Sequence, residues 1–257
     1  ENSSLDVIGY APGYERFGGR NDSAFQDAIA LARRAEVVIL WLGLDELAET
    51  EGMDREDMSL RPCQVELLEA LSRENSSIVV VLSGGAPIET PWISCCKSLI
   101  HGYLGGQAGA GAMADLLTGN AVPCGKLAES WPMTLEDTPC ARYYPGREKT
   151  AEYREGIYVG YRYYDTVGKQ VRFPFGFGLS YTSFEYADLD VSDTEATFRI
   201  TNTGDVPGAE IAQLYISIEE PKVFRPIREL KGFAKAFLQP GESKTVSILL
   251  DDKAFRY

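Results

Sequence analysis

The sequence has a single histidine, and its five cysteines include no C-x-x-C pair. An odd number of cysteines at irregular spacing predicts neither a disulfide framework nor a zinc knuckle, so we expect no metal and no cofactor. The histidine, His101, lies in a strand-like apolar run, which favours a packed side chain over a metal ligand or a base. This usage favours a reducing, cytoplasmic location. The cysteines are Cys63, Cys95, Cys96, Cys124 and Cys140.

Long hydrophobic runs and an excess of basic residues are also missing. No apolar run approaches the ~20 residues that span a bilayer. With 25 Lys and Arg against 38 Asp and Glu, the net charge is -13, which opposes binding to nucleic acid or anionic membranes. We expect a neutral substrate, and a homo-oligomer is compatible with this composition. Glycosylation triplets at Asn2, Asn21 and Asn75 keep secretion open as an alternative.

The first half of the chain alternates apolar runs with helical patterns, as expected of βα units on a mostly parallel sheet. Residues 37–43 and 78–82 are continuously apolar, which is typical of strands covered on both faces. We predict an α/β domain over residues 1–136. Its other expected elements are strands at 5–10, 98–103 and 126–131 and helices at 23–35, 62–72 and 108–118.

The second half of the chain changes composition and then periodicity. Residues 137–183 are rich in Tyr, Arg, Gly and Pro, and we expect an ordered connector that its tyrosines pin to the α/β domain. Alternating strands then predict an antiparallel β-sandwich over residues 184–257. We count about five strands where an immunoglobulin-like sandwich has about seven, so we expect an incomplete sandwich in a piece of a longer protein. The clearest strands are at 196–202, 210–217, 229–238 and 243–250.

An acidic loop of about 18 residues separates the strand at 37–43 from the helix at 62–72. Connections of this kind usually have ~2–6 residues, and α/β folds place sites at the carboxyl ends of strands. Seven carboxylates share this loop with two arginines, and mutual repulsion can raise one pKa toward neutrality.

A carboxylic acid that stays protonated near neutral pH can donate its proton to a leaving group. Gly52 would let the backbone approach a ligand closely. The residues themselves leave Glu46, Glu49 and Glu51 open as that acid, and a solvated acidic loop that caps the next helix is the alternative interpretation.

The stretch Glu49-Thr-Glu-Gly-Met-Asp-Arg-Glu56, followed by Leu60 and Gln64, closely resembles the acid/base loop of glycoside hydrolase family 3 β-glucosidases. Further motifs in the family's order carry the resemblance along almost the whole chain. The resemblance implies an α/β sandwich domain followed by a fibronectin type III-like domain. These motifs are Val80-Val-Leu-Ser-Gly84 with Pro91-Trp92, Gly105-Gly-Gln107, Ala114-Asp-Leu-Leu-Thr-Gly119, Gly125-Lys-Leu127, Gly160-Tyr-Arg-Tyr-Tyr-Asp165 and Phe173-Pro-Phe-Gly-Phe-Gly-Leu-Ser-Tyr-Thr182.

The resemblance implies that Glu51, which precedes the glycine, is the general acid/base of a retaining β-glucosidase that releases terminal non-reducing β-D-glucosyl residues. Asp54 and Arg55 are interpreted as an ion pair that shapes the loop, and a simple surface pair is the alternative interpretation. A β-glucoside or short oligosaccharide is the expected substrate, with a β-xyloside as the alternative.

The resemblance also implies a nucleophilic aspartate beside a tryptophan on a TIM-barrel domain. The three tryptophans follow Leu40, Pro91 and Ser130, so this Asp-Trp signature is absent from the sequence. We expect the barrel, before or after this segment, in the same protein or in a companion chain, and we expect the isolated chain to be inactive.

Two other functions remain as alternatives. Gly109-Ala-Gly-Ala-Met-Ala114 fits G-x-G-x-x-A between a strand and a helix, and Glu129 follows at the spacing of a ribose-binding acid. Small residues that let a helix pack closely on the sheet explain the same pattern. A carbohydrate-binding or structural module without chemistry of its own is the other alternative.

Overall fold

The computed structural model describes residues 5–146 and 148–256 and forms two compact units. The first unit holds the described residues up to Thr118 together with Pro132–Glu136, and the second holds Gly119–Trp131 and the residues from Asp137 onward. Residues 137–183 thus belong to the second unit, and the expectation that they pack on the α/β domain stays a prediction. The domain boundaries at 136 and 183 stay a prediction. The triplet at Asn2 lies outside the described residues.

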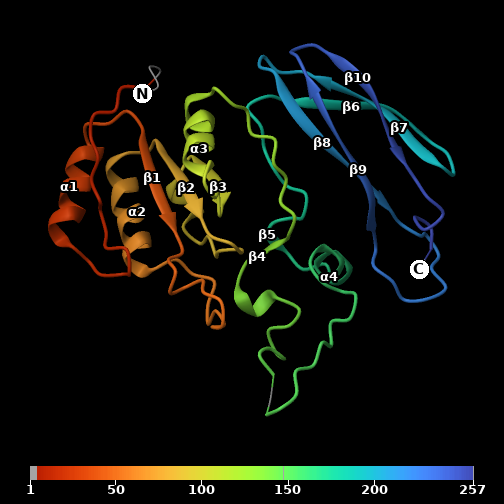
Figure 1. Ribbon diagram of the computed structural model, residues 1–257, viewed down its shortest axis with the longest axis horizontal. Helices are drawn as coiled ribbons and strands as arrows, with labels where there is room; N and C mark the ends of the chain where they lie inside the picture. The colour runs from red at the N-terminus through yellow and green to blue at the C-terminus, as the bar shows by residue number, and fades with distance from the viewer. Residues whose placement is uncertain (1–4, 147, 257) are drawn as a thin grey trace. The chain divides into compact units, whose positions relative to one another are not determined.

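The first unit is built on a parallel sheet in the order β1 (Val38–Gly43), β2 (Ile78–Ser83) and β3 (Ser98–Tyr103), as predicted (Figure 1). Helix α1 (Asp22–Ala32) precedes β1, α2 (Pro62–Glu74) connects β1 to β2, η1 (Ile93–Cys95) lies between β2 and β3, and α3 (Gly109–Thr118) follows β3. The strand predicted at 5–10 is wrong, because this segment has no regular structure. No helix in the described part of the chain is long and apolar enough to cross a membrane.

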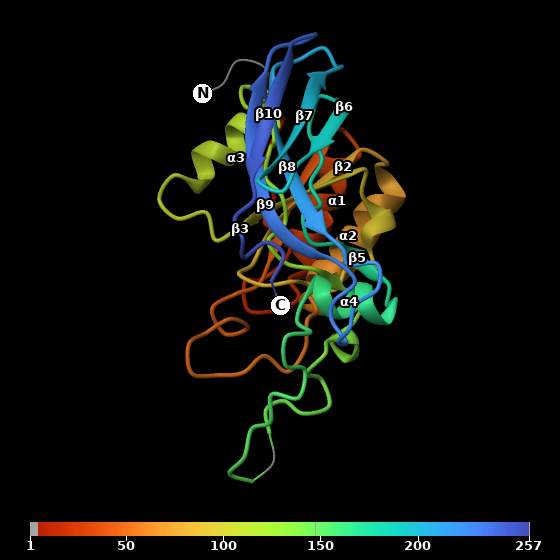
Figure 2. The same cartoon turned by 90° about the vertical axis from the view of Figure 1, so that its right-hand side faces the viewer.

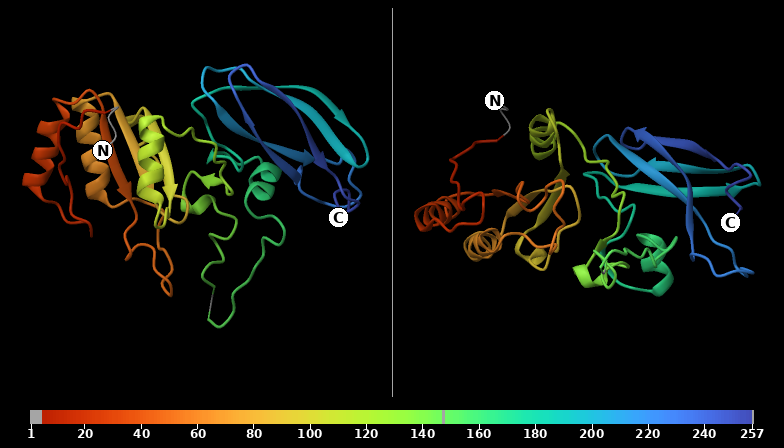
Figure 3. Two further views of the ribbon diagram at one scale, coloured as in Figure 1. Left: turned by 45° about the horizontal axis from the view of Figure 1, so that its top comes forward. Right: turned by 60° about the horizontal axis from the view of Figure 1, so that its bottom comes forward.

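The side chains of the strands show how far the sheet is covered. In β2, Val80, Val81 and Leu82 are fully buried, so both faces of this central strand are packed. In β1, Leu42 is buried but Trp41 is half exposed. The expectation of double coverage therefore holds for β2 and fails for β1 within the described residues. Figure 3 shows α1 and α2 next to each other and α3 apart from them.

The second unit is an antiparallel β-sandwich of two sheets. One sheet has the order β10 (Ser243–Leu249), β7 (Glu195–Asn202) and β6 (Phe184–Val191), and the other pairs β8 (Gly208–Ile216) with β9 (Glu229–Leu238) (Figure 2). Ahead of them in the chain come a short pair of strands, β4 (Trp131–Pro132) and β5 (Val171–Phe173), and the helices η2 (Leu135–Asp137) and α4 (Tyr161–Val167). Of these, residues Pro132–Glu136 belong to the first unit. The predicted strand at 126–131 is therefore limited to its last residue. The incompleteness of the sandwich stays a prediction.

Asn202 links the two sheets of the sandwich and is fully buried. Its Oδ1 accepts hydrogen bonds from Thr182 Oγ1 at 2.6 Å and from the Gly204 amide at 3.1 Å. Its Nδ2 donates to the carbonyl oxygens of Val206 at 2.9 Å and of Leu238, in β9, at 3.1 Å. The whole amide is thus satisfied, as a buried polar group requires.

Replacing Asn202 with Asp is expected to lower the free energy of unfolding by about 3 kcal/mol or more. The carboxylate cannot donate to the Val206 and Leu238 carbonyls, and it places an unpaired charge in the core. Urea denaturation at pH 7 measures the change. The matched control is Gln170→Glu, the same chemical change on an exposed side chain, with an expected effect within about 0.5 kcal/mol. Equal stability of the two variants would contradict the linking role of Asn202.

Candidate functional site

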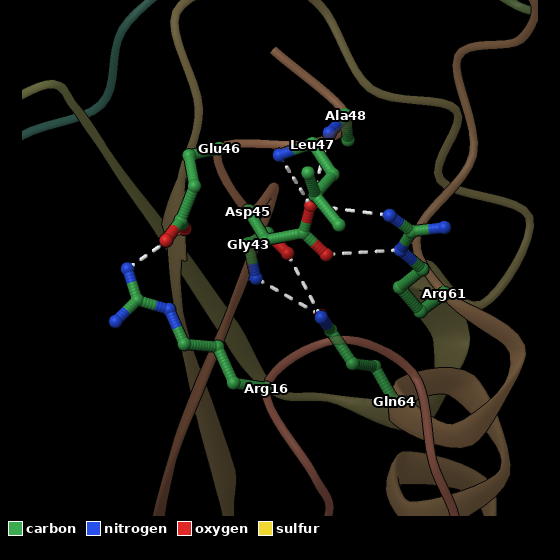
Figure 4. Close-up of polar contacts among 8 residues, drawn as sticks. All are labelled: Arg16, Gly43, Asp45, Glu46, Leu47, Ala48, Arg61 and Gln64. Carbon is green, nitrogen blue, oxygen red and sulfur yellow. Dashed lines mark hydrogen bonds and ion pairs between the residues drawn. The ribbon is translucent and has the colours of Figure 1, made fainter. Parts of the chain in front are cut away.

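The acidic loop of residues 44–61 leaves the carboxyl end of β1, and a buried ion pair closes its base. The Asp45 side chain is 4% exposed, with Oδ2 3.0 Å from Arg61 Nε and Oδ1 3.1 Å from Arg61 Nη2. Oδ1 also accepts hydrogen bonds from the amides of Leu47 and Ala48, both at 2.9 Å (Figure 4). The Arg61 guanidinium, helped by these amides, holds the pKa of Asp45 below its ordinary value.

A second contact at the base holds the end of the strand itself. Gln64, from the first turn of α2, is 2% exposed. Its Oε1 accepts from the Gly43 amide at 3.0 Å, and its Nε2 donates to the Gly43 carbonyl at 2.8 Å (Figure 4). A Cβ on Gly43 would lie 2.4 Å from the Ser83 carbonyl oxygen, so only glycine fits here. Strand, loop and helix are therefore fixed to one another at this point.

The three candidate glutamates occupy different surroundings. Glu46 forms an exposed ion pair with Arg16 at 2.8 Å. Glu49 is 19% exposed, and its Oε2 accepts a hydrogen bond from the Gly85 amide at 2.7 Å. Glu51 is exposed and, among the described residues, has no hydrogen-bond or ion-pair partner. Of the three carboxylates, Glu51 is the one that no structural contact occupies.

Glu51 lies at the tip of the loop, where the chain reverses. The Met53 amide donates to the Thr50 carbonyl at 3.5 Å, and Gly52 has a φ of 86°. A Cβ at Gly52 would meet no atom within 4 Å, so the left-handed backbone conformation, rather than space, calls for glycine.

The two residues expected to shape the loop, Asp54 and Arg55, come directly after this chain reversal. Asp54 is exposed, whereas Arg55 is 21% exposed and donates from Nη1 to the Pro87 carbonyl at 3.2 Å. The same nitrogen is 3.7 Å from Oε1 of Glu49. An Asp54–Arg55 ion pair stays a prediction.

Sequence reasoning assigned no role to the pair Asp45–Arg61, which the structure places at the base of the loop. A signal was present, because Asp45 follows the strand by two residues and Arg61 directly precedes the proline that opens α2. The carboxylate at such a position can cap the exposed amides of a turn.

The glycine-rich motif of the dinucleotide alternative lies inside α3 and not in the turn after β3. The fingerprint needs its first glycine in that turn, where phosphate would approach the backbone. A Cβ on Gly109 or Gly111 would meet no atom within 4 Å, so close packing on the sheet does not explain these glycines either. Glu129 belongs to the other compact unit. The geometry disfavours a dinucleotide site.

His101 and one of the connector tyrosines, Tyr161, make packing contacts within the fold. The ring of His101 lies 4.0 Å from that of Tyr103, and burial lowers the pKa of His101 to about 4. In the connector, Tyr161 packs against Phe175 and Tyr215, and its hydroxyl accepts from the Leu230 amide at 2.8 Å. These contacts tie α4 to the β-strand unit.

Comparison with protein families gives two matches. Residues 5–161 match the Glycosyl hydrolase family 3 C-terminal domain, and residues 210–257 match the Fibronectin type III-like domain. Their order is the one predicted from the sequence motifs.

Curated relatives match nearly the whole chain. Thermostable beta-glucosidase B of Acetivibrio thermocellus is 46% identical over 257 residues, with 96% of this chain and 34% of the relative covered. An exo-alpha-(1->6)-L-arabinopyranosidase of Bifidobacterium longum is 44% identical over 255 residues, with the same coverage. The chain thus spans about a third of the length of these relatives.

Solved structures match in fold as well. A GH3 beta-glucosidase of Bifidobacterium adolescentis superposes with a TM-score of 0.92 at 43% identity, covering 95% of this chain and 37% of that one. A beta-glucosidase of Kluyveromyces marxianus in complex with glucose gives 0.85 at 42% identity, covering 90% and 28%.

Replacing Asp45 with Asn is expected to lower the free energy of unfolding by about 2–3 kcal/mol at pH 7. Removing one partner of a fully buried pair costs ~3–5 kcal/mol, and the 35% exposure of Arg61 reduces this figure. Thermal or urea denaturation measures it, with Glu46→Gln, which breaks an exposed pair, as the control.

The pH dependence of this difference has a definite sign. Because folding lowers the pKa of Asp45, the pair stabilises fully above the unfolded pKa of ~3.9 and loses its contribution as the pH falls through the folded pKa. The gap between the wild-type chain and Asp45→Asn should therefore narrow at acid pH. A gap that is constant between about pH 7 and pH 3 would contradict the ion pair as its cause.

Proposed function

The chain belongs to glycoside hydrolase family 3, and from this premise we propose that it supplies the general acid/base, Glu51, to a retaining β-glucosidase. The rest of the active site, including the nucleophilic aspartate, would come from a TIM-barrel domain of the same protein or of a companion chain. The observation that carries the proposal is the exposed Glu51 carboxylate, without a partner among the described residues, on a loop whose base is fixed.

The position of Glu51 suits a proton donor that meets its substrate at the surface of this domain. A carboxylate held by a cation or by amides is stabilised in its charged form and is a poor acid. Arg61 holds Asp45 in this way. Glu46 and Glu49 already have partners, Arg16 and the Gly85 amide, which occupy their oxygens. Glu51 is free of such contacts in the described structure, which supports it over Glu46 and Glu49.

Glu51 would act in both steps of the reaction. In the first step, the barrel aspartate attacks the anomeric carbon while Glu51 transfers its proton to the glycosidic oxygen, and the bond to the aglycone breaks. In the second step, the Glu51 carboxylate takes a proton from water as the water oxygen attacks the anomeric carbon, which releases the sugar and the aspartate. The two carboxyl groups must lie ~5–5.5 Å apart, so this domain has to meet the barrel closely.

The substrate class follows from the relatives. The proposed substrate is a β-glucoside or a short oligosaccharide with a terminal β-glucosyl residue. A second candidate is an α-L-arabinopyranoside, because a relative with nearly the same identity is named for that activity. Full-length protein assayed on nitrophenyl β-D-glucoside, β-D-xyloside and α-L-arabinopyranoside distinguishes these by kcat/KM.

In the full-length protein, Glu51→Gln is expected to lower kcat/KM for an alkyl β-glucoside by about 100- to 10,000-fold, the usual contribution of a general acid. Formation of the glycosyl-enzyme from a dinitrophenyl glucoside should stay near the wild-type rate, because that leaving group needs no proton. Steady-state and pre-steady-state kinetics measure the two effects.

A complementary variant tests the second step. Azide is expected to speed turnover of Glu51→Ala and to form a glucosyl azide, because azide attacks without a base. Glu46→Gln, in the same loop, should behave as wild type. Equal loss on both classes of leaving group in Glu51→Gln, with no azide rescue, would exclude Glu51 as the acid/base.

The 257-residue chain alone is expected to show no hydrolysis of nitrophenyl β-glucoside, because it carries one of the two carboxyl groups that the mechanism needs. The full-length protein assayed beside it is the positive control. Turnover by the isolated chain that is lost in Glu51→Gln would show that this chain holds a complete site.

A further inference from the structure

Two side chains bracket the loop tip that carries Glu51. Glu49 directly precedes residues 50–54, and Arg55 directly follows them. Glu49 Oε1 and Arg55 Nη1 lie 3.7 Å apart, and the two side chains are 19% and 21% exposed. The five-residue tip is thus closed at its neck by an ion pair, well above the Asp45–Arg61 pair at its base.

Each side chain of the neck also reaches across to the segment that follows β2. The Gly85 amide donates to Glu49 Oε2 at 2.7 Å, and Arg55 Nη1 donates to the Pro87 carbonyl at 3.2 Å. The two contacts have opposite polarity, since the carboxylate accepts from an amide and the guanidinium donates to a carbonyl. Neither side chain could replace the other in its contact.

The segment that receives these contacts is itself well fixed. Ile88 is 1% exposed and Thr90 is 2% exposed. The Glu89 amide donates to the Met58 carbonyl at 2.7 Å, and Glu89 Oε1 accepts from the Leu135 amide at 3.0 Å. A tip tied to this segment is tied to the core of the α/β unit.

We propose that Glu49 and Arg55 are positioning residues that hold the Glu51 carboxyl group in the geometry of proton transfer. This inference rests on the proposed function of Glu51. Within the tip, the Met53 amide donates to the Thr50 carbonyl, and the contacts of Glu49 and Arg55 fix the two points between which the tip is held. A displacement of ~1 Å can cost about 100-fold in rate.

The test uses the full-length protein with Glu49→Ala, Arg55→Ala and the double variant. Each single variant is expected to lower kcat for an alkyl β-glucoside by about 10- to 100-fold, with KM changed less than about threefold. Glycosyl-enzyme formation from a dinitrophenyl glucoside should stay near wild type. Because the two side chains act as one clasp, the double variant should lose no more than the worse single variant.

Matched variants separate positioning from simple loss of charge or of fold. Glu46→Gln removes a loop carboxylate whose ion pair is exposed and should keep wild-type kinetics. Glu49→Gln keeps an oxygen for the Gly85 amide, so it should recover part of the loss. Thermal unfolding shows whether each variant folds, and Glu49→Gln carries the test if Glu49→Ala does not.

Cleavage by a glutamyl endoprotease after Glu51 provides a readout that does not need activity. The initial rate should rise in Glu49→Gln and Arg55→Ala and stay unchanged in Glu46→Gln. Additive kinetic losses, equal losses on both leaving groups, or an unchanged cleavage rate would overturn the clasp. If Glu51→Gln lost activity equally with both leaving groups, the proposed function would be overturned. The proteolysis rates alone would then show whether Glu49 and Arg55 hold the tip in place.

Discussion

The ion pair between Asp45 and Arg61 fixes the point where the acidic loop leaves the sheet. It joins the two ends of an 18-residue connection, because Asp45 follows β1 and Arg61 precedes α2. With the base closed, the entropic cost of bringing the two ends of the loop together is already met, and further contacts within the loop span shorter stretches of chain. This closure positions the rest of the loop, which consists of the turn at 45–49, the neck at Glu49 and the tip beyond it.

The carboxylates of the loop differ in the contacts that they make. Of the three candidate glutamates, Glu46 and Glu49 have partners that occupy their oxygens, whereas Glu51 has none among the described residues. The carboxylates of the loop repel one another. A cation that pairs with one of them offsets its negative charge and so reduces this repulsion.

Much of the fold could be predicted from local sequence. The apolar runs at β1 and β2 both form strands, with the side chains of β2 buried on both faces and those of β1 on one, and the alternating pattern of β7 follows from one covered face. The run at 5–10 is also mostly apolar but pairs with no strand among the described residues, because a short apolar run alone does not determine a strand. For the candidate site, the length and acidity of the loop indicated its place in the chain, and the family resemblance selected Glu51, whose role stays a prediction. The contacts of Glu49 with Gly85 and of Arg55 with Pro87 could not be predicted in this way, because they join residues more than 30 positions apart.

Gln64 holds the end of β1 through the amide and carbonyl of Gly43, so it recognises main-chain atoms rather than a particular side chain. The contacts between Gln64 and Gly43 therefore do not depend on which side chains the tip carries. For protein engineering, this makes residues 50–54 a natural cassette, in which libraries or tips from related enzymes can be exchanged while the sheet and the helix beneath remain unaltered.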